Sequence, residues 1–188
     1  MIRTIYPLLA LALVASVPAL AAELVPTGPF DAVGLEGGGN VTIVPGAAQR
    51  VTILEGSSQY TRIYVEHGRS LRIETCNRNC PEHYRLKVEI QSPRVPTLAV
   101  DGGGAIGVAN GFAPERRLTA AVNGGGRIDT RALDVGDFTA AVNGGGELLV
   151  RAASRLTGAV RGGGVVRYWG NPEVTSAIEG GGSVKPGD

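Results

Sequence analysis

Residues 118–126 read Leu-Thr-Ala-Ala-Val-Asn-Gly-Gly-Gly, and residues 138–146 read Phe-Thr-Ala-Ala-Val-Asn-Gly-Gly-Gly. The Gly-Gly-Gly triplet that ends this unit occurs six times, at 37–39, 102–104, 124–126, 144–146, 162–164 and 180–182. From Gly102 onward the triplets start 22, 20, 18 and 18 residues apart. A repeat of this period indicates that one short structural unit is stacked several times.

Large apolar residues stand at even distances from the first glycine of each triplet. Because side chains alternate between the two faces of a strand, these positions share one face, which we expect to be buried. The phase is the same before and after the triplet, so the glycines bend the strand without exchanging its faces. The positions two before and four after the first glycine are Leu35 and Val41, Val100 and Ile106, Val122 and Ile128, Val142 and Leu148, Val160 and Val166, and Ile178 and Val184.

The odd positions form an equally regular set on the opposite face. In the five C-terminal units Thr stands five residues before the triplet and Ala stands three residues before it. These small side chains predict a flat surface. The threonines are Thr97, Thr119, Thr139, Thr157 and Thr175, and the alanines are Ala99, Ala121, Ala141, Ala159 and Ala177.

Columns of like residues predict that equivalent positions lie above one another in neighbouring coils, about 4.8 Å apart. An antiparallel meander would bring unlike positions together. A left-handed hexapeptide helix would need an apolar residue every six positions, a period that this sequence lacks. We therefore expect an all-β fold, with a right-handed parallel β-helix-like stack of about four coils from Thr97 to Val184.

Stacking of this kind predicts particular neighbours. The expected neighbours are Arg127 with Glu147, Arg161 with Glu179, and Asn123 with Asn143. Stacked bends leave no room for Cβ atoms, so replacing Gly125 or Gly145 with Val is expected to strain the fold.

Residues 22–93 read differently from the triplet repeats of 94–188, although both parts are expected to form one continuous domain. Short alternating strands are separated here by Pro-Gly, Glu-Gly and His-Gly pairs, which predicts a mainly antiparallel portion. Cys76 and Cys80 lie between the strand-like runs 71–75 and 84–90, which predicts a disulfide in the loop of a β-hairpin. A redox pair is the alternative, but the spacing is C-x3-C and no helix follows.

Residues 1–21 have the features of a signal peptide. Arg3 is followed by the apolar residues 8–17 and by Ala19-Leu20-Ala21, a small-residue cleavage site. The apolar run is too short to cross a bilayer, so we expect an exported chain without a membrane span. The chain has 18 basic and 17 acidic residues, and removing residues 1–21 removes Arg3 and no acid, which leaves 17 of each. This neutral balance disfavours nucleic acid as a partner.

Residue types that carry chemistry are few. His67 and His83 are the two histidines, and both are expected at the surface rather than in a catalytic or zinc site. Residues 124–129 read like one calcium-binding glycine-rich turn, but the required Asp129 does not recur in the other coils. The candidate acids of a glycan-cleaving site, Asp101, Glu147 and Glu179, are scattered through different coils. We therefore predict no catalytic residues, no cofactor and no metal.

Several motifs follow one another in a characteristic order. They are Phe30-x-x-Val33 before the first triplet, Leu71-x-Ile73, Ile90-x-x-Pro93, the repeated Gly-x-Gly strand units, Val166-x-Tyr168-x-Gly170-x-Pro172, and Ile178-x-Gly180-Gly181-Gly182. Over nearly the whole chain after residue 21, this order resembles the putative auto-transporter adhesin head GIN domain family. The usual triplet of that family is Gly-Ser-Gly, so no role of its Ser hydroxyl carries over. The resemblance implies a β-helix-like fold in bacterial envelope proteins, in the periplasm, at the cell surface or secreted, and it supplies no catalytic residues.

The flat face is the predicted functional surface. We expect a non-enzymatic envelope module for binding, adhesion or scaffolding, with this face packed on an envelope protein, a glycan, a second copy or the N-terminal strands. A carbohydrate-active lyase or hydrolase is the alternative, and an ice- or crystal-surface binder is a third, which one Thr column in place of two disfavours. Trp169 is interpreted as core or cap packing, with a ligand-stacking aromatic as the alternative. The candidate binding residues are Thr97, Thr119, Thr139, Thr157, Thr175, Ala121, Ala141 and Ala159.

Overall fold

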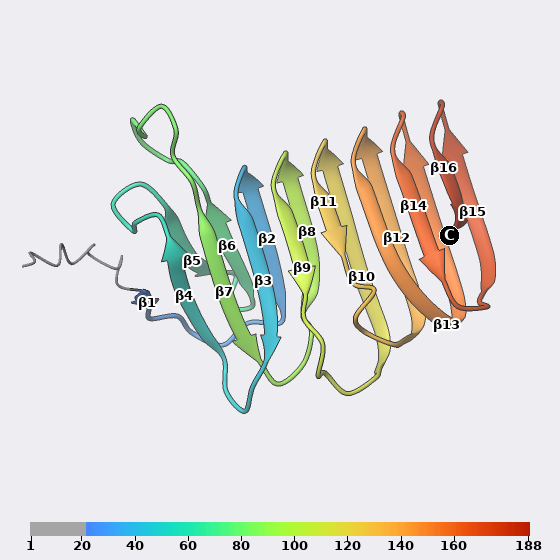
Figure 1. The fold of residues 1–188 in the computed structure, drawn as a ribbon, viewed down its shortest axis with the longest axis horizontal. Coiled ribbons are helices and arrows are strands. Elements are labelled where there is room, and N and C mark those ends of the chain that lie inside the picture. The colour runs from blue at the N-terminus through green and yellow to red at the C-terminus, as the bar shows by residue number, and fades with distance from the viewer. Residues whose placement is uncertain (1–21) are drawn as a thin grey trace, which may run out of the picture.

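The computed structural model describes residues 22–188, so the predicted signal peptide of residues 1–21 lies outside the described residues. Residues 22–188 form sixteen strands and no helix, and the all-β prediction is confirmed for this part of the chain. The strands are arranged as one elongated stack (Figure 1). No helix long and apolar enough to cross a membrane occurs between residues 22 and 188.

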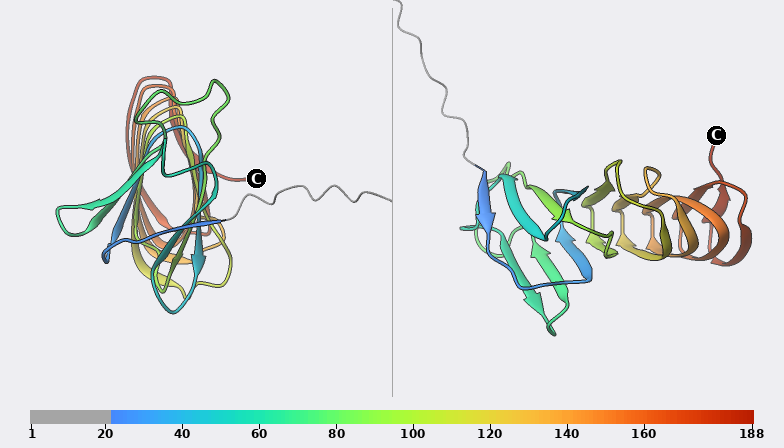
Figure 2. Two further views of the ribbon diagram at one scale, coloured as in Figure 1. Left: turned by 90° about the vertical axis from the view of Figure 1, so that its left-hand side faces the viewer. Right: turned by 90° about the horizontal axis from the view of Figure 1, so that it is seen from below.

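Two sheets face each other along this stack (Figure 2). The first sheet contains, in spatial order, β1 (Glu23–Val25), β4 (Arg50–Glu55), β7 (Lys87–Ser92), β3 (Asn40–Pro45), β9 (Ala105–Val108), β11 (Arg127–Asp129), the beginning of β13 (Glu147–Arg161), β14 (Val165–Trp169) and β16 (Ser183–Pro186). The second sheet contains β5 (Arg62–Glu66), β6 (Ser70–Glu74), β2 (Ala32–Gly37), β8 (Thr97–Gly102), β10 (Glu115–Gly124), β12 (Val135–Gly144), the end of β13 and β15 (Glu173–Glu179).

The strands of the second sheet pair in parallel and in register from β8 to β15. Val122, for example, lies between Val100 and Val142, its equivalents in the two adjacent coils. The predicted stacking of like residues over like residues is thus confirmed for these strands. The expected neighbours are confirmed as well, because Arg127 contacts Glu147, Arg161 Nε lies 3.1 Å from Glu179 Oε2, and Asn143 Nδ2 donates to Asn123 Oδ1 at 3.0 Å.

The glycine triplets form the corners between the two sheets, at one end of the strands (Figure 1). The first glycine of each triplet has a positive φ, which is +113° at Gly144. A Cβ at Gly144 would lie 2.7 Å from the carbonyl oxygen of Gly124, whereas a Cβ at Gly125 or Gly145 would meet no atom within 4 Å. The prediction that substitution of the middle glycines strains the fold is therefore wrong. From the second triplet onward, the steric restriction falls on the first and third glycines, whose Cβ positions face the preceding coil.

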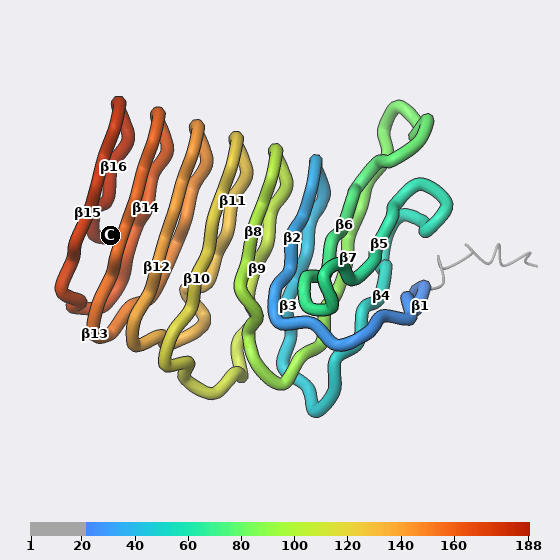
Figure 3. Tube along the Cα trace, turned by 180° about the vertical axis from the view of Figure 1, so that it is seen from behind, coloured from blue at the N-terminus to red at the C-terminus, as the bar shows by residue number. Residues whose placement is uncertain are grey.

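The stack continues into the N-terminal part of the chain. β2 pairs in parallel with β8 and β6, and β3 pairs in parallel with β9 and β7. Antiparallel pairs join β1 to β4, β4 to β7 and β5 to β6, at the N-terminal end of the stack (Figure 3). The expected antiparallel pairing therefore applies to β1, β4 and β5 but not to β2 and β3, so that the fold is mixed.

Cys76 and Cys80 form the predicted disulfide, but the predicted hairpin around it is wrong. The disulfide loop leads from β6 in the second sheet to β7 in the first sheet, and these two strands pair with other strands. The loop thus makes the same crossing between sheets that the glycine triplets make in the other coils. The physical reason is that β6 pairs in parallel with β2, and β7 with β3. This pairing buries the apolar residues of β6 and β7 in the common core between the two sheets.

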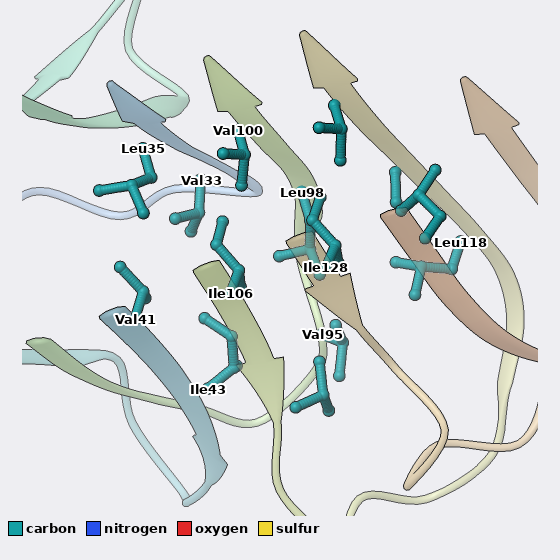
Figure 4. Packing of buried hydrophobic residues seen from close by; sticks show 14 of the residues in the cluster. Val33, Leu35, Val41, Ile43, Val95, Leu98, Val100, Ile106, Leu118 and Ile128 are labelled. Carbon is teal, nitrogen blue, oxygen red and sulfur yellow. The ribbon is translucent and has the colours of Figure 1, made fainter. Parts of the chain in front are cut away.

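The hydrophobic core lies between the two sheets. Apolar side chains enter it from both sides, such as Val100 and Leu118 from the second sheet and Ile106 and Ile128 from the first sheet (Figure 4). Each of these residues stands at an even distance from the first glycine of its triplet. Residues of the second sheet that stand at odd distances are consequently on its outer surface.

Candidate functional site: an exposed threonine and alanine face

The predicted threonine column is continuous on the outer surface of the second sheet. Thr119 pairs with Thr139, Thr139 with Thr157, and Thr157 with Thr175, each in parallel register. Thr97 directly precedes Leu98, which pairs with Ala120, so Thr97 extends the column by one coil. All five threonines are exposed to solvent. The N-terminal strands therefore do not cover them, and one of the expected partners of this face is excluded.

The alanine column runs beside the threonines on the same face. Ala121 pairs with Ala99 on one side and Ala141 on the other, and Ala159 and Ala177 continue the column. The first three alanines are half-buried, whereas Ala159 and Ala177 are exposed. We name the surface made by these two columns the Thr/Ala face.

Polar side chains border the Thr/Ala face along both edges. At the glycine corners, Asn123 Nδ2 donates to Asp101 Oδ1 at 2.6 Å, and an amide hydrogen bond links Asn123 to Asn143. At the opposite edge, basic and acidic residues alternate from coil to coil. This second row consists of Arg117, Asp137, Arg155 and Glu173. Because the charges alternate, the face has no strong potential of either sign, which suits a neutral partner better than a polyanion.

A groove of about 580 Å³ opens at the N-terminal end of the Thr/Ala face, beside Thr97 and Thr119. Three arginines from separate segments line it. The sequence pattern did not indicate the groove, because Arg69 and Arg94 belong to no repeated column and only Arg117 lies in one. Each of them already pairs with a carboxylate, so the groove is close to charge balance. The pairs are Arg69 with Asp31, Arg94 with Glu115 at 2.8 Å, and Arg117 with Asp137 at 3.8 Å.

These arginine pairs differ in their surroundings. Glu115 is buried and receives two hydrogen bonds from Arg94, which orders the loop between β7 and β8. Asp31 is exposed, and the hydrogen bond from Arg69 lowers its pKa below the usual value of 3.8. The arginines therefore shape the wall of the groove and neutralise carboxylates there.

The candidate catalytic acids lie apart from one another. Asp101 contacts Asn123, Glu147 contacts Arg127 and Arg167, and Glu179 contacts Arg161. His67 lies in the turn between β5 and β6 with a positive φ of 49°. Within residues 22–188, no three His, Cys, Asp or Glu side chains gather as a metal site.

Trp169 packs against the C-terminal residues of the chain. Its Nε1 donates to the carbonyl oxygen of Asp188 at 3.2 Å, and the Arg131 guanidinium carbon lies 5.2 Å from its ring centroid. The backbone N of Gly187 donates to the carbonyl oxygen of Tyr168 at 2.8 Å. These contacts fit the interpretation of Trp169 as cap packing better than that of a free ligand platform.

Arg131 also holds Asp129, which gives the fold a predicted acid sensitivity. Partial burial by itself raises the pKa of Asp129, but the hydrogen bonds and charge of Arg131, aided by Arg127, outweigh it and lower the pKa below 3.8. A lowered pKa in the folded state stabilises the fold above the unfolded value, and this contribution is lost as the pH falls through the folded value.

We therefore expect Asp129→Asn to be less stable than wild type at pH 7 and to approach wild type between about pH 4 and pH 2. Thermal unfolding of both proteins across this range measures the difference. A difference in melting temperature that stays constant from pH 7 to pH 2 would contradict the role of the ionised carboxylate.

Part of the repeated coils is similar to a known family. Residues 115–172 match the model of the putative auto-transporter adhesin, head GIN domain family. This match confirms the resemblance for the coils from β10 to β14 and is narrower than the resemblance read from the sequence. Within the GIN domain match lie Thr119, Thr139 and Thr157, while Thr97 and Thr175 lie outside it.

Solved structures resemble a larger part of the chain. A putative adhesin from Bacteroides fragilis has 14% identity and a TM-score of 0.51, covering 88% of this chain and 96% of that one. A putative adhesin from Parabacteroides distasonis has 16% identity and a TM-score of 0.44, covering 88% of this chain and 96% of that one. At this level of identity, the likeness to the Bacteroides fragilis protein shows a shared fold. No curated protein matches the chain.

Proposed function

We propose that this chain is an exported, non-enzymatic envelope module that binds or adheres through the Thr/Ala face, with an envelope protein or a glycan as partner. The observation that carries the proposal is the uninterrupted register of Thr119, Thr139, Thr157 and Thr175 on an exposed surface. The GIN domain match and the adhesin names of the similar structures support it.

The chemistry of the face suits contact with a flat, neutral surface. Stacked strands hold the threonine hydroxyls about 4.8 Å apart, so their order exists before binding and little conformational entropy is lost. The hydroxyls supply donors and acceptors, and the neighbouring alanine methyl groups supply apolar contact. We take the coils as one right-handed parallel β-helix, and the parallel, in-register pairs support the stacking of coils in this description.

Arginine substitutions on the face test this function. We expect the double variant Thr139→Arg, Thr157→Arg to lose at least about tenfold in affinity, because two long charged side chains would prevent close contact. Binding of purified protein to an array of bacterial envelope glycans and to immobilised envelope proteins is the measurement. Both positions are exposed, so the folding stability should change by less than about 0.5 kcal/mol.

The matched control is Thr42→Arg, an exposed threonine on β3 in the first sheet. We expect it to bind as wild type does. Equal binding by the double variant and wild type, or equal loss in the Thr42 control, would remove the Thr/Ala face from the binding mechanism. Cleavage of a glycan by the wild-type protein would favour the enzymatic alternative instead.

A further inference from the structure

The C-terminal end of the stack exposes part of the hydrophobic core. Val174 and Ile178 on β15 are 37% and 44% exposed, although they occupy inward-facing columns of the repeat. Their equivalents in the preceding coil, Leu156 and Val160, are both 0% exposed. The difference arises because a coil lies on each side of Leu156 and Val160, whereas β15 has a neighbouring coil on one side.

The backbone of β15 is unpaired along the same edge. Within residues 22–188, β15 pairs with β13 alone, and β16 pairs with β14 alone (Figure 3). An edge strand with free N–H and C=O groups beside exposed apolar side chains is a template for another strand. The two edges differ in this respect, because Lys185 and Pro186 on β16 oppose strand addition and β15 contains neither residue type.

The sequence of β15 is complementary to itself when it is read in the opposite direction. In an antiparallel pair of two β15 strands centred on Ser176, Val174 of one copy lies opposite Ile178 of the other. Both apolar pairs then lie on the inward face, where they would cover the exposed end of the hydrophobic core in each copy. Small residues occupy the middle of the strand, Thr175 opposite Ala177 and Ser176 opposite its own copy, so no bulky side chain separates the two backbones.

The charges at the two ends of β15 allow this pairing. The antiparallel register places Glu173 opposite Glu179 of the other copy, and such a pair of like charges would by itself oppose association. Glu179 is already neutralised by Arg161, whose Nε lies 3.1 Å from Glu179 Oε2, and Glu173 lies beside Arg155 in the strand register. Each carboxylate therefore enters the contact with a basic neighbour from its own chain.

We propose that this end of the stack is the docking surface for a second copy of the chain, which forms a two-fold symmetric dimer by antiparallel pairing of β15 with β15. A two-fold contact uses the same patch on both copies, as the self-complementary strand requires. The dimer joins the two hydrophobic cores end to end and leaves both Thr/Ala faces accessible. This proposal does not depend on the binding function, because it rests on the unpaired edge of β15 and on the exposed, inward-column residues Val174 and Ile178.

Sedimentation equilibrium of the purified protein at about 1–100 μM tests the association, since contacts of modest area form in this range. We expect a dimer for wild type and at least a hundredfold weaker association for Ile178→Glu, which places an unpaired charge in the contact. The matched control is Leu54→Glu, because Leu54 on β4 is also 44% exposed but lies at the other end of the stack. A wild-type protein that stays monomeric, or an equal effect of the two substitutions, would overturn the proposal.

A cysteine variant tests the register itself. Ser176→Cys places the two thiols opposite each other on the two-fold axis, so mild oxidation is expected to give a covalent dimer that is reversible by reductant. Thr175→Cys should give little covalent dimer, because Ala177 of the other copy lies opposite residue 175 in this register. Circular dichroism checks that both variants are folded. Equal cross-linking of the two variants, or none in a dimeric Ser176→Cys protein, would overturn the antiparallel pairing.

Discussion

Gly144→Ala is expected to lower the free energy of unfolding by about 3–5 kcal/mol, far more than an ordinary surface substitution. Gly144 has a φ of +113°, a conformation that alanine rarely adopts. An added Cβ would also lie 2.7 Å from the carbonyl oxygen of Gly124. Relief of this contact would require the two coils to separate, because the carbonyl belongs to the backbone of the neighbouring corner. Urea denaturation with a two-state fit measures the change.

Gly145→Ala is the matched control for this prediction. Gly145 belongs to the same triplet, but its Cβ would meet no atom within 4 Å and its φ is not positive. We expect a change of less than about 0.5 kcal/mol at this position. Comparable losses in the two variants would show that the triplet is sensitive as a whole, and the close stacking of the first glycines would then not explain its composition.

Phe138→Ala is expected to destabilise the protein by about 3–5 kcal/mol. Phe138 is 1% exposed, is among the largest fully buried side chains, and lies in the coil between Leu118 and Leu156. Rigid parallel coils on both sides limit the collapse of the space that the ring leaves, so both the lost transfer energy and the cavity contribute. Thermal and urea unfolding measure the loss.

Thr139→Ala provides the comparison for the core substitution. Thr139 is the next residue on the same strand, but its side chain is exposed on the Thr/Ala face. A change of less than about 0.5 kcal/mol is expected, because no buried contact is lost. If Thr139→Ala were as destabilising as Phe138→Ala, the assignment of inward and outward columns would be wrong.

The repeat made the central part of the fold predictable. Its columns placed Thr139 beside Thr119 and Thr157, and Arg127 beside Glu147, because identical positions in a stack of equal coils share one environment. The same columns separated buried residues from exposed ones. The threonine and alanine columns of the candidate site could therefore be predicted from strand periodicity and coil length alone. The groove beside them could not.

Other features depended on contacts that no repeat encodes. The strands before Cys76 and after Cys80 are close in sequence and look like a hairpin. Instead, β6 pairs in parallel with β2, and β7 pairs in parallel with β3. The groove brings together Arg69, Arg94 and Arg117 from three unrelated segments. The sequence also shows that the triplets are all glycine without showing which of the three glycines faces the preceding coil.

From the sequence alone follow the all-β fold, the face on which each repeat residue lies and the disulfide between Cys76 and Cys80. These properties are local or periodic, so neighbouring residues and equal spacings are enough to determine them. The tertiary structure decided the order of the N-terminal strands and the exposure of Val174 and Ile178 at the end of the stack. Both depend on which coil has a neighbour, and that is a property of the assembled sheets rather than of any one strand.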